Sequence, residues 1–314
     1  MIRFVSMLLL AAAAASAVSQ KAAAYTALIE QDLRLATVGY RLASANAPFC
    51  NRKARNPGWV LHDEQQYPDR KIAASAFQFR QPVSVAAIVA GGPADKAGMQ
   101  KGDGLVSING VVWVWDRSAP SKANSKRLES VFEQVDRELA IGGPVLVTLE
   151  TTRGTRQFKL DPPAVCASRF WVDVRDRKDA GADGDKVRIT SGMMNYVVDD
   201  AELAAVVAHE LAHNILDHRA QLDAVKRGKT KATLATEIEA DRLSVWLMAN
   251  AGYDTAAALR FADRYGRDYG LGIFSEGTHL RWRNRAKVKQ AEIDLMAQTV
   301  RVAGKLPPPL LTNK

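Results

Sequence analysis

An uninterrupted helical run from Asp199 to Leu216 constrains this chain more than any other stretch. The run reads DDAELAAVVAHELAHNIL and contains neither glycine nor proline. Its acidic start, with Glu202 three residues after Asp199, is typical of a capped helix N-terminus. Residues four apart share a helix face, so His209 and His213 lie side by side. The face is apolar around the pair, where an unpartnered polar cluster is costly to bury, and we therefore expect the two imidazoles to bind a metal ion.

The spacing of these histidines fits zinc. Two imidazoles on one helix face can bind one tetrahedral ion, while Glu210, one step round the helix, is placed to act on water rather than on the metal. This is the H-E-x-x-H pattern of zinc metalloproteases. The metzincin subclass is excluded, because its third histidine would fall at Arg219 and its glycine at Leu216.

The third ligand is expected on a later helix, because catalytic zinc uses three protein ligands and one open position. The segment TEIEAD, residues 236–241, lies in a helical pattern that ends at Gly252. Glu237 and Asp241 are four residues apart, so one can bind the metal and the other can accept the N–H of a ligand imidazole. Glu239 is turned about 200° from Glu237, and we interpret it as a solvated or interhelical carboxylate.

Residues 68–162 are rich in short strands and turns. Strands are expected at 82–89, within 102–110, at 145–150 and at 157–160, with a hairpin turn at Asn109-Gly110 and a helix at 126–139. The string GGPADKAGMQKGDGLVSING resembles the PDZ domain. That resemblance implies a small β-sandwich that captures C-termini or extended segments by strand addition. The alternative is a purely structural insert. Before this segment we expect a helix at 22–45 and irregular chain at 51–69.

The first residues, MIRFVSMLLLAAAAASAVSQ, are typical of a secretory signal peptide, with cleavage near Ala17. The apolar run is too short to cross a bilayer, and we expect an exported protein, periplasmic or secreted, without a transmembrane segment. The net charge is +9, but the cations are scattered. We therefore expect no nucleic-acid partner and a solvated basic surface suited to peripheral membrane contact.

Two cysteines, Cys50 and Cys166, bracket the PDZ-like segment. An even count in an oxidising compartment predicts a disulfide between them, the alternative being two buried free thiols. The expected organisation is a signal peptide at 1–17, an N-terminal helix and connecting segment of the protease domain at 18–67, a PDZ-like domain at 68–162 and a catalytic domain at 163–314. The fold class is α+β, with a mainly helical catalytic domain carrying a small β-sheet.

Four segments in order, VRITSGMM, DDAELAAVVAHELAHNILDH, TEIEADRLSVWLMANAGYD and GTHLRWRNR, resemble the HtpX-like and CAAX-prenyl-endopeptidase family of gluzincin metallopeptidases, in its soluble, exported, BepA-like branch. The resemblance covers about residues 165 to 300. It implies one zinc ion per chain held by His209, His213 and Glu237, with Glu210 as catalytic base and Asp241 behind a ligand histidine. Thr278-His279 corresponds to the family's T-H-P element, with Leu280 in place of proline. His279 would polarise the scissile carbonyl or occupy the open position in a latent state.

Together these patterns predict a zinc-dependent metalloendopeptidase that hydrolyses unfolded or extended polypeptides, with protein quality control as its setting. The segment from Val187 to Met194 is expected to be an edge strand to which a peptide adds. Two alternatives remain open: a PDZ-containing chaperone or adaptor with a latent, closed zinc site, and a structural metal protein. His62 and His218 are interpreted as ordinary histidines away from the ligand face.

Overall fold

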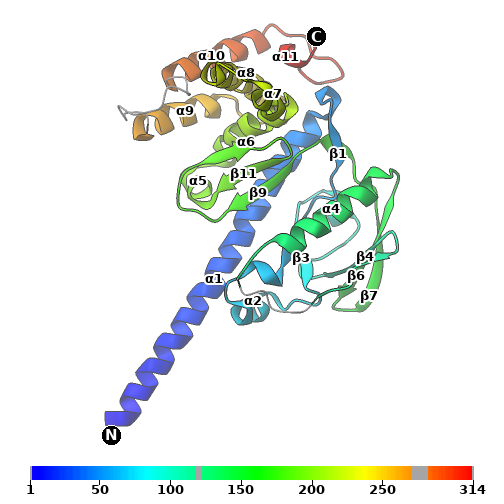
Figure 1. Ribbon diagram of the computed structural model, residues 1–314, viewed down its shortest axis with the longest axis vertical. Helices are drawn as coiled ribbons and strands as arrows, with labels where there is room; N and C mark the ends of the chain where they lie inside the picture. The colour runs from blue at the N-terminus through cyan, green and yellow to red at the C-terminus, as the bar shows by residue number, and fades with distance from the viewer. Residues whose placement is uncertain (1, 117–121, 270–281, 313–314) are drawn as a thin grey trace. The chain divides into compact units, whose positions relative to one another are not determined.

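The computed structural model describes residues 2–116, 122–269 and 282–312. The chain forms two compact units (Figure 1). The first contains the chain up to Leu33 and Pro57–Pro162, and the second contains Arg34–Asn56 and the chain from Pro163 onward. Helix α1 (Ile2–Ala45) is continuous and contributes to both units. It includes the expected helix at 22–45 and also the segment expected to be a signal peptide, whose cleavage stays a prediction.

The first unit contains one six-stranded sheet with neighbours in the order β2-β3-β4-β6-β7, and with β5 paired to β4. Every pairing is antiparallel. Asn109 and Gly110 both have positive φ at the turn between β4 and β5, which confirms the predicted hairpin. The elements are β2 (Trp59–Asp63), η2 (Glu64–Gln66), α2 (Arg70–Phe77), β3 (Val83–Ile88), α3 (Pro93–Lys96), β4 (Gly104–Ile108), β5 (Val111–Val112), α4 (Lys126–Ala140), β6 (Val145–Thr151) and β7 (Gly154–Leu160).

Helix α4 is amphipathic. Leu128, Val131, Val135 and Leu139 recur at three- and four-residue spacing and are all buried. Apolar strand residues of the same unit, among them Val147 and Leu149, are likewise buried. The unit therefore has its own hydrophobic core of sheet and helix.

Residues 51–69 differ from the irregular chain that the sequence predicts. Trp59–Asp63 forms β2 and pairs antiparallel with β3, so this stretch is part of the sheet of the first unit. Leu61 and Asp63 of this strand are buried. The expected domain boundary at residue 68 therefore differs from the structure, in which the unit resumes at Pro57.

The second unit is mainly helical and confirms the predicted α+β class. Helices α6, α8, α9 and α10 pack on one another, beside a three-stranded sheet and a two-stranded ribbon. The elements are η1 (Ala47–Phe49), β1 (Lys53–Arg55), β8 (Ala164–Cys166), β9 (Arg169–Asp173), β10 (Ala180–Ala182), β11 (Lys186–Thr190), α5 (Ser191–Tyr196), α6 (Asp200–Ile215), α7 (His218–Ala224), α8 (Lys229–Asn250), α9 (Ala256–Tyr269), α10 (Trp282–Met296) and α11 (Pro309–Thr312).

The expected edge strand is wrong in two respects. Strand β11 lies at the centre of the three-stranded sheet, between antiparallel β10 and parallel β9. The strand also stops at Thr190, whose side chain accepts a hydrogen bond from the backbone N–H of Met193 and so begins α5. The edge beside α6 is β10.

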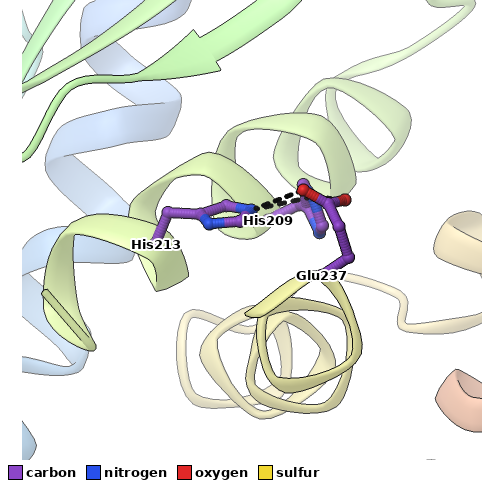
Figure 2. A group of neighbouring side chains, drawn as sticks. All are labelled: His209, His213 and Glu237. Carbon is purple, nitrogen blue, oxygen red and sulfur yellow. Dashed lines mark hydrogen bonds and ion pairs between the residues drawn. The ribbon is translucent and has the colours of Figure 1, made fainter. Parts of the chain in front are cut away.

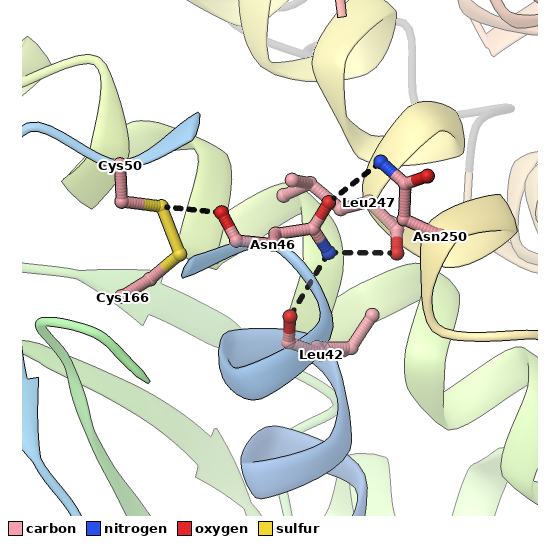
Figure 3. Close-up of a disulfide and its surroundings, with 6 residues drawn as sticks. All are labelled: Leu42, Asn46, Cys50, Cys166, Leu247 and Asn250. Atoms are coloured by element: carbon pink, nitrogen blue, oxygen red, sulfur yellow. Dashed lines mark hydrogen bonds between the residues drawn. A yellow bond between two sulfur atoms is a disulfide. The ribbon is translucent and has the colours of Figure 1, made fainter. Parts of the chain in front are cut away.

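The predicted disulfide is present between Cys50 and Cys166, next to the β1–β8 ribbon (Figure 3). Nearby, the buried side chain of Asn46 donates hydrogen bonds to the carbonyl oxygens of Leu42 and Leu247 and accepts one from Asn250. These contacts fix the end of α1 to the end of α8. Among the described residues, no helix combines the length and the apolar character that a membrane span requires.

Candidate metal centre

Helix α6 is fixed at its start and buried along most of its length. The carboxylate of Asp199 accepts a hydrogen bond from the backbone N–H of Glu202 at 2.8 Å, as the capping pattern predicts. Leu203, Val207 and Leu211 are fully buried, so packing fixes the rotation of the helix. His209 and His213 then emerge together toward α8, which packs against α6.

Three side chains converge between α6 and α8 (Figure 2). Nε2 of His209 lies 3.3 Å from Nε2 of His213, and these two atoms lie 3.4 and 3.5 Å from the two carboxylate oxygens of Glu237. One nitrogen or oxygen from each side chain falls within 4.8 Å of the others. Among the described residues this is the one group of three or more such side chains that could hold a metal ion.

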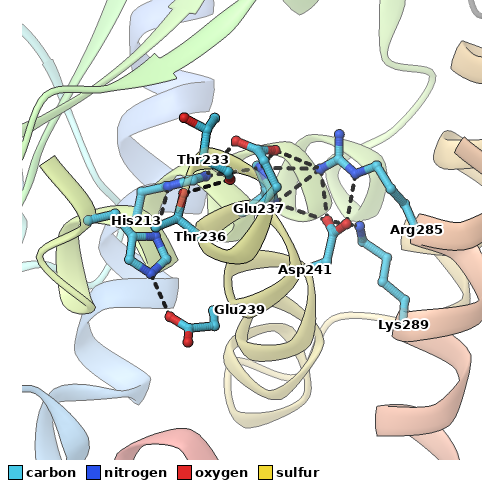
Figure 4. Close-up of polar contacts among 10 residues, drawn as sticks. His213, Thr233, Thr236, Glu237, Glu239, Asp241, Arg285 and Lys289 are labelled. Atoms are coloured by element: carbon cyan, nitrogen blue, oxygen red, sulfur yellow. Dashed lines mark hydrogen bonds and ion pairs between the residues drawn. The ribbon is translucent and has the colours of Figure 1, made fainter. Parts of the chain in front are cut away.

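Asp241, Arg285 and Lys289 form a buried charge cluster (Figure 4). This cluster contacts the His209 ring, and Nη2 of Arg285 lies 3.3 Å from Nδ1 and 3.2 Å from Nε2 of His209. Nδ1 of His209 lies 3.1 Å from Oδ1 of Asp241. Asp241 is fully buried and also accepts hydrogen bonds from Arg285, at 2.7 and 2.8 Å, and from Lys289. Arg285 and Lys289 both come from α10. One carboxylate thus holds a ligand-type histidine and two cations.

The electrostatics of the centre follow from this arrangement. Burial raises the pKa of the Asp241 carboxyl, but Lys289 and Arg285 outweigh burial and hold that pKa well below its usual value. Burial and the positive charge of Arg285 lower the pKa of His209. Hydrogen bonds to Asp241 and Glu237 outweigh them, so the net effect raises the pKa of His209 to about 9. The carboxylates therefore stabilise positive charge at the convergence point.

Glu210 stands beside the cluster without contributing one of the three converging atoms. Burial raises the pKa of its carboxyl to about 7, with Glu237 adding to the rise and the positive charges of His209 and Arg285 opposing it. A carboxyl with a pKa near neutrality can both accept and release a proton at physiological pH.

The expectation for His218 was wrong, whereas Glu239 is a partly exposed, interhelical carboxylate, as the sequence predicts. His218 is 1% exposed, and its Nδ1 lies 2.9 Å from Nδ1 of His213. Its Nε2 lies 3.1 Å from a carboxylate oxygen of Glu239. His218 therefore contacts a ligand-type histidine, because the turn after α6 directs the chain back toward the centre.

The other predicted site residues divide as follows. The structure brings His209, Glu210, His213, Glu237 and Asp241 into one neighbourhood, while His279 lies outside the described residues. Arg285 and Lys289 were not singled out from the sequence. The sequence does indicate that a buried Asp241 needs cationic partners. It does not show which of the many lysines and arginines in the chain approach Asp241. His62, expected in a polar loop, is a buried residue of β2.

The donor set fits a zinc ion. Two imidazole nitrogens and one carboxylate oxygen are the ligands of catalytic zinc sites that keep an open position. His209, His213 and Glu237 would hold the ion, and Asp241 would accept the remaining N–H of His209.

Comparisons with known families match both units. Residues 176–236 match the family model of Peptidase family M48, and residues 84–119 match that of the PDZ domain. The first match contains His209, Glu210 and His213 and ends just before Glu237. It implies metallopeptidase activity, and the second implies a peptide-binding module.

Solved structures similar to the chain include PDZ domains. The HtrA3 PDZ domain bound to a phage-derived ligand is 17% identical, with a TM-score of 0.24, over 36% of this chain and 89% of that one. A PDZ domain protein from Parabacteroides distasonis is 16% identical, also with a TM-score of 0.24, over 36% of this chain and 21% of that one. This chain therefore spans about a fifth of the second protein. No curated protein matches the sequence.

Proposed function

We propose that this protein is a zinc-dependent metalloendopeptidase of the HtpX-like and BepA-like type. The observation that carries the proposal is the convergence of His209, His213 and Glu237 within 4.8 Å, with Glu210 one residue along from the first ligand. The ligand set uses one zinc ion per chain. When bound, zinc supplies a Lewis acid that polarises a carbonyl and acidifies water.

The side chains of the protein perform the proton transfers. Glu210 acts as general base toward the attacking water and returns the proton to the leaving amine, because its carboxylate follows the ligand His209 directly and is not one of the three ligand groups. Asp241 accepts the N–H of His209 and fixes the orientation of that ring. Arg285 and Lys289 keep Asp241 ionised, so that it accepts throughout the reaction. His279 remains a candidate for polarising the scissile carbonyl.

The substrate that we propose is an unfolded or extended polypeptide. Strand β10 is a sheet edge of small residues beside α6, and its backbone can pair with an added peptide strand. The sequence of β10 is Ala-Gly-Ala, so little side-chain bulk prevents a close approach. Backbone pairing depends little on the side chains of the peptide, and such broad sequence specificity suits a quality-control protease. The PDZ-like unit would bind C-termini or extended segments.

We further propose that the protein acts in an exported compartment, periplasmic or secreted. The signal-like start of the chain and the Cys50–Cys166 disulfide support this location, because disulfides persist in oxidising environments.

Hydrolysis of unfolded casein with and without a zinc chelator tests the function. We expect cleavage by the full chain, loss of cleavage and of bound zinc with the chelator, and recovery of both on zinc addition. Glu237→Ala serves as the metal-free control. Zinc binding without cleavage, together with suppressed aggregation of the casein, would instead identify the chaperone or adaptor with a latent site. Chelation that unfolds the protein without any cleavage beforehand would identify a structural metal protein.

A further inference from the structure

The ring nitrogen of His213 that faces away from Glu237 has another histidine as its partner. Nδ1 of His213 lies 2.9 Å from Nδ1 of His218, and Nε2 of His218 lies 3.1 Å from Oε2 of Glu239. The two rings meet edge to face, with centroids 4.9 Å apart. His218 is 1% exposed, whereas the Glu239 side chain is 43% exposed. We call this series Glu239–His218–His213 the histidine relay.

Local backbone geometry explains why His218 reaches His213. Helix α6 ends at Ile215, and Asp217 adopts a left-handed conformation with φ of 57°. That conformation is uncommon outside glycine, but aspartate tolerates it better than most residues. The chain reverses there, and His218 becomes the first residue of α7. The side chain is thereby returned to the end of α6.

The protons of the relay have one consistent arrangement once His213 binds metal. Nε2 of His213 faces His209 and Glu237, so it must be the ligand atom and carries no proton. The neutral ring then has its proton on Nδ1 and donates it to Nδ1 of His218. His218 in turn has its proton on Nε2 and donates to the carboxylate of Glu239. Each of the four ring nitrogens in the series then has a partner.

We infer that His218 is a positioning residue for the zinc ligand His213, and that Glu239 fixes the orientation and tautomer of His218. The inference rests on the proposed function. The two ligand histidines are then supported alike: His209 directly by Asp241, and His213 by Glu239 through His218. Helix α8 supplies both carboxylates, and Figure 4 shows Glu239 and Asp241 on different sides of it.

Zinc affinity of the full-length chain, measured by competition with a chromogenic chelator, tests the relay. His218→Phe keeps a ring but removes both hydrogen bonds, and we expect the zinc Kd to rise about 10- to 100-fold. Glu239→Ala should raise it by a smaller factor, and Glu239→Gln, which still accepts from His218, should restore most of the loss. Asp223→Ala removes an exposed carboxylate on α7 outside the relay and is the matched control.

Two further readouts separate positioning from general stability. In the His218→Phe background, Glu239→Ala should have no additional effect on the zinc Kd, because its route to the metal is gone. The visible bands of the cobalt-substituted protein should shift in His218→Phe and stay unchanged in Asp223→Ala. If His218→Phe does not fold, the Glu239 variants still test the relay, because the Glu239 side chain is partly exposed and its replacement should not prevent folding.

These measurements distinguish failure of the relay from failure of the proposed zinc-dependent function. If the unmodified chain binds no zinc, the proposed function and the relay fall together. If it binds zinc but the His218 and Glu239 variants match Asp223→Ala, only the relay is overturned. The same holds if the Glu239→Ala effect persists undiminished in the His218→Phe background.

Discussion

Nδ1 of His209 lies 3.1 Å from Oδ1 of Asp241, while Nε2 of the same ring faces Glu237 at 3.4 Å. The ring is thus held on one edge by a carboxylate that also pairs with Arg285 and Lys289. One buried group therefore links the orientation of a ligand to the stability of the packing between α8 and α10.

Asp241→Asn should weaken zinc binding and folding together. The zinc Kd is expected to rise about 10- to 100-fold, because the acceptor behind His209 loses its charge. The metal-free protein should lose about 3 to 5 kcal/mol in its free energy of unfolding, because Arg285 and Lys289 stay buried without their counterion. Chelator competition and urea denaturation measure the two effects. Asp223→Asn is the control, and unchanged stability of Asp241→Asn would contradict the buried charge cluster.

Reduction of the Cys50–Cys166 disulfide should destabilise the second unit. The bond joins residues 116 apart in sequence. In the chain-entropy account, closing a loop of this length contributes about 5 kcal/mol by restricting the unfolded chain. Thermal unfolding of the chain with and without reductant, and of a Cys50→Ser, Cys166→Ser double variant, should show matching losses. Equal melting of the oxidised and reduced chains would exclude this contribution.

Acid should destabilise the first unit through His62. Burial, with help from Lys101, lowers the pKa of His62 to about 3, and its Nδ1 lies 2.9 Å from the hydroxyl of Tyr67. An unfolded imidazole has a pKa of about 6.5, so between these values the unfolded chain binds a proton that the folded chain does not. Stability is therefore full above about pH 6.5 and falls toward pH 3, by about 2 kcal/mol at pH 5.

The difference in pH dependence between the unmodified chain and His62→Gln isolates this effect, because the other histidines are common to both. Urea denaturation between pH 5 and 8 should give a flatter curve for His62→Gln. Parallel curves would mean that His62 does not stay neutral in the folded unit.

Gly39→Ala should destabilise the second unit although it replaces glycine within a helix. Alanine in a helix interior is normally favoured by about 1 kcal/mol. A Cβ at Gly39 of α1, however, would lie 2.5 Å from ring atoms of Phe170, so the ring must move. We expect a lowered melting temperature for Gly39→Ala, with the loss reduced or reversed in a Phe170→Leu background. A stabilised single variant would show that α1 does not approach Phe170 this closely.

Much of the metal centre could be predicted because its residues follow helical spacing. His209 and His213 share a face of one helix and Glu237 and Asp241 share a face of another, so the period alone groups them. His218 could not be grouped this way, because the left-handed turn at Asp217 brings it back. Arg285 lies on a helix whose packing against α8 depends on tertiary contacts.

The strands show the same limit. The turn at Asn109-Gly110 has a local signature, and the structure confirms it. Strand β2 has none, since Trp59–Asp63 is short and follows Pro57 and Gly58, and only its pairing with β3 identifies it. The central place of β11 likewise depends on β9 and β10, which the local sequence of β11 does not reveal.

The most direct test of the proposed enzyme separates zinc binding from catalysis in Glu210→Gln. Zinc content by atomic absorption and hydrolysis of unfolded casein should be measured on the same preparations of this variant and the unmodified chain. We expect about one zinc per chain in both, with hydrolysis abolished in Glu210→Gln, because this carboxylate acts on water and the metal is held by three other side chains. Loss of zinc from Glu210→Gln, or hydrolysis at the unmodified rate, would contradict this expectation.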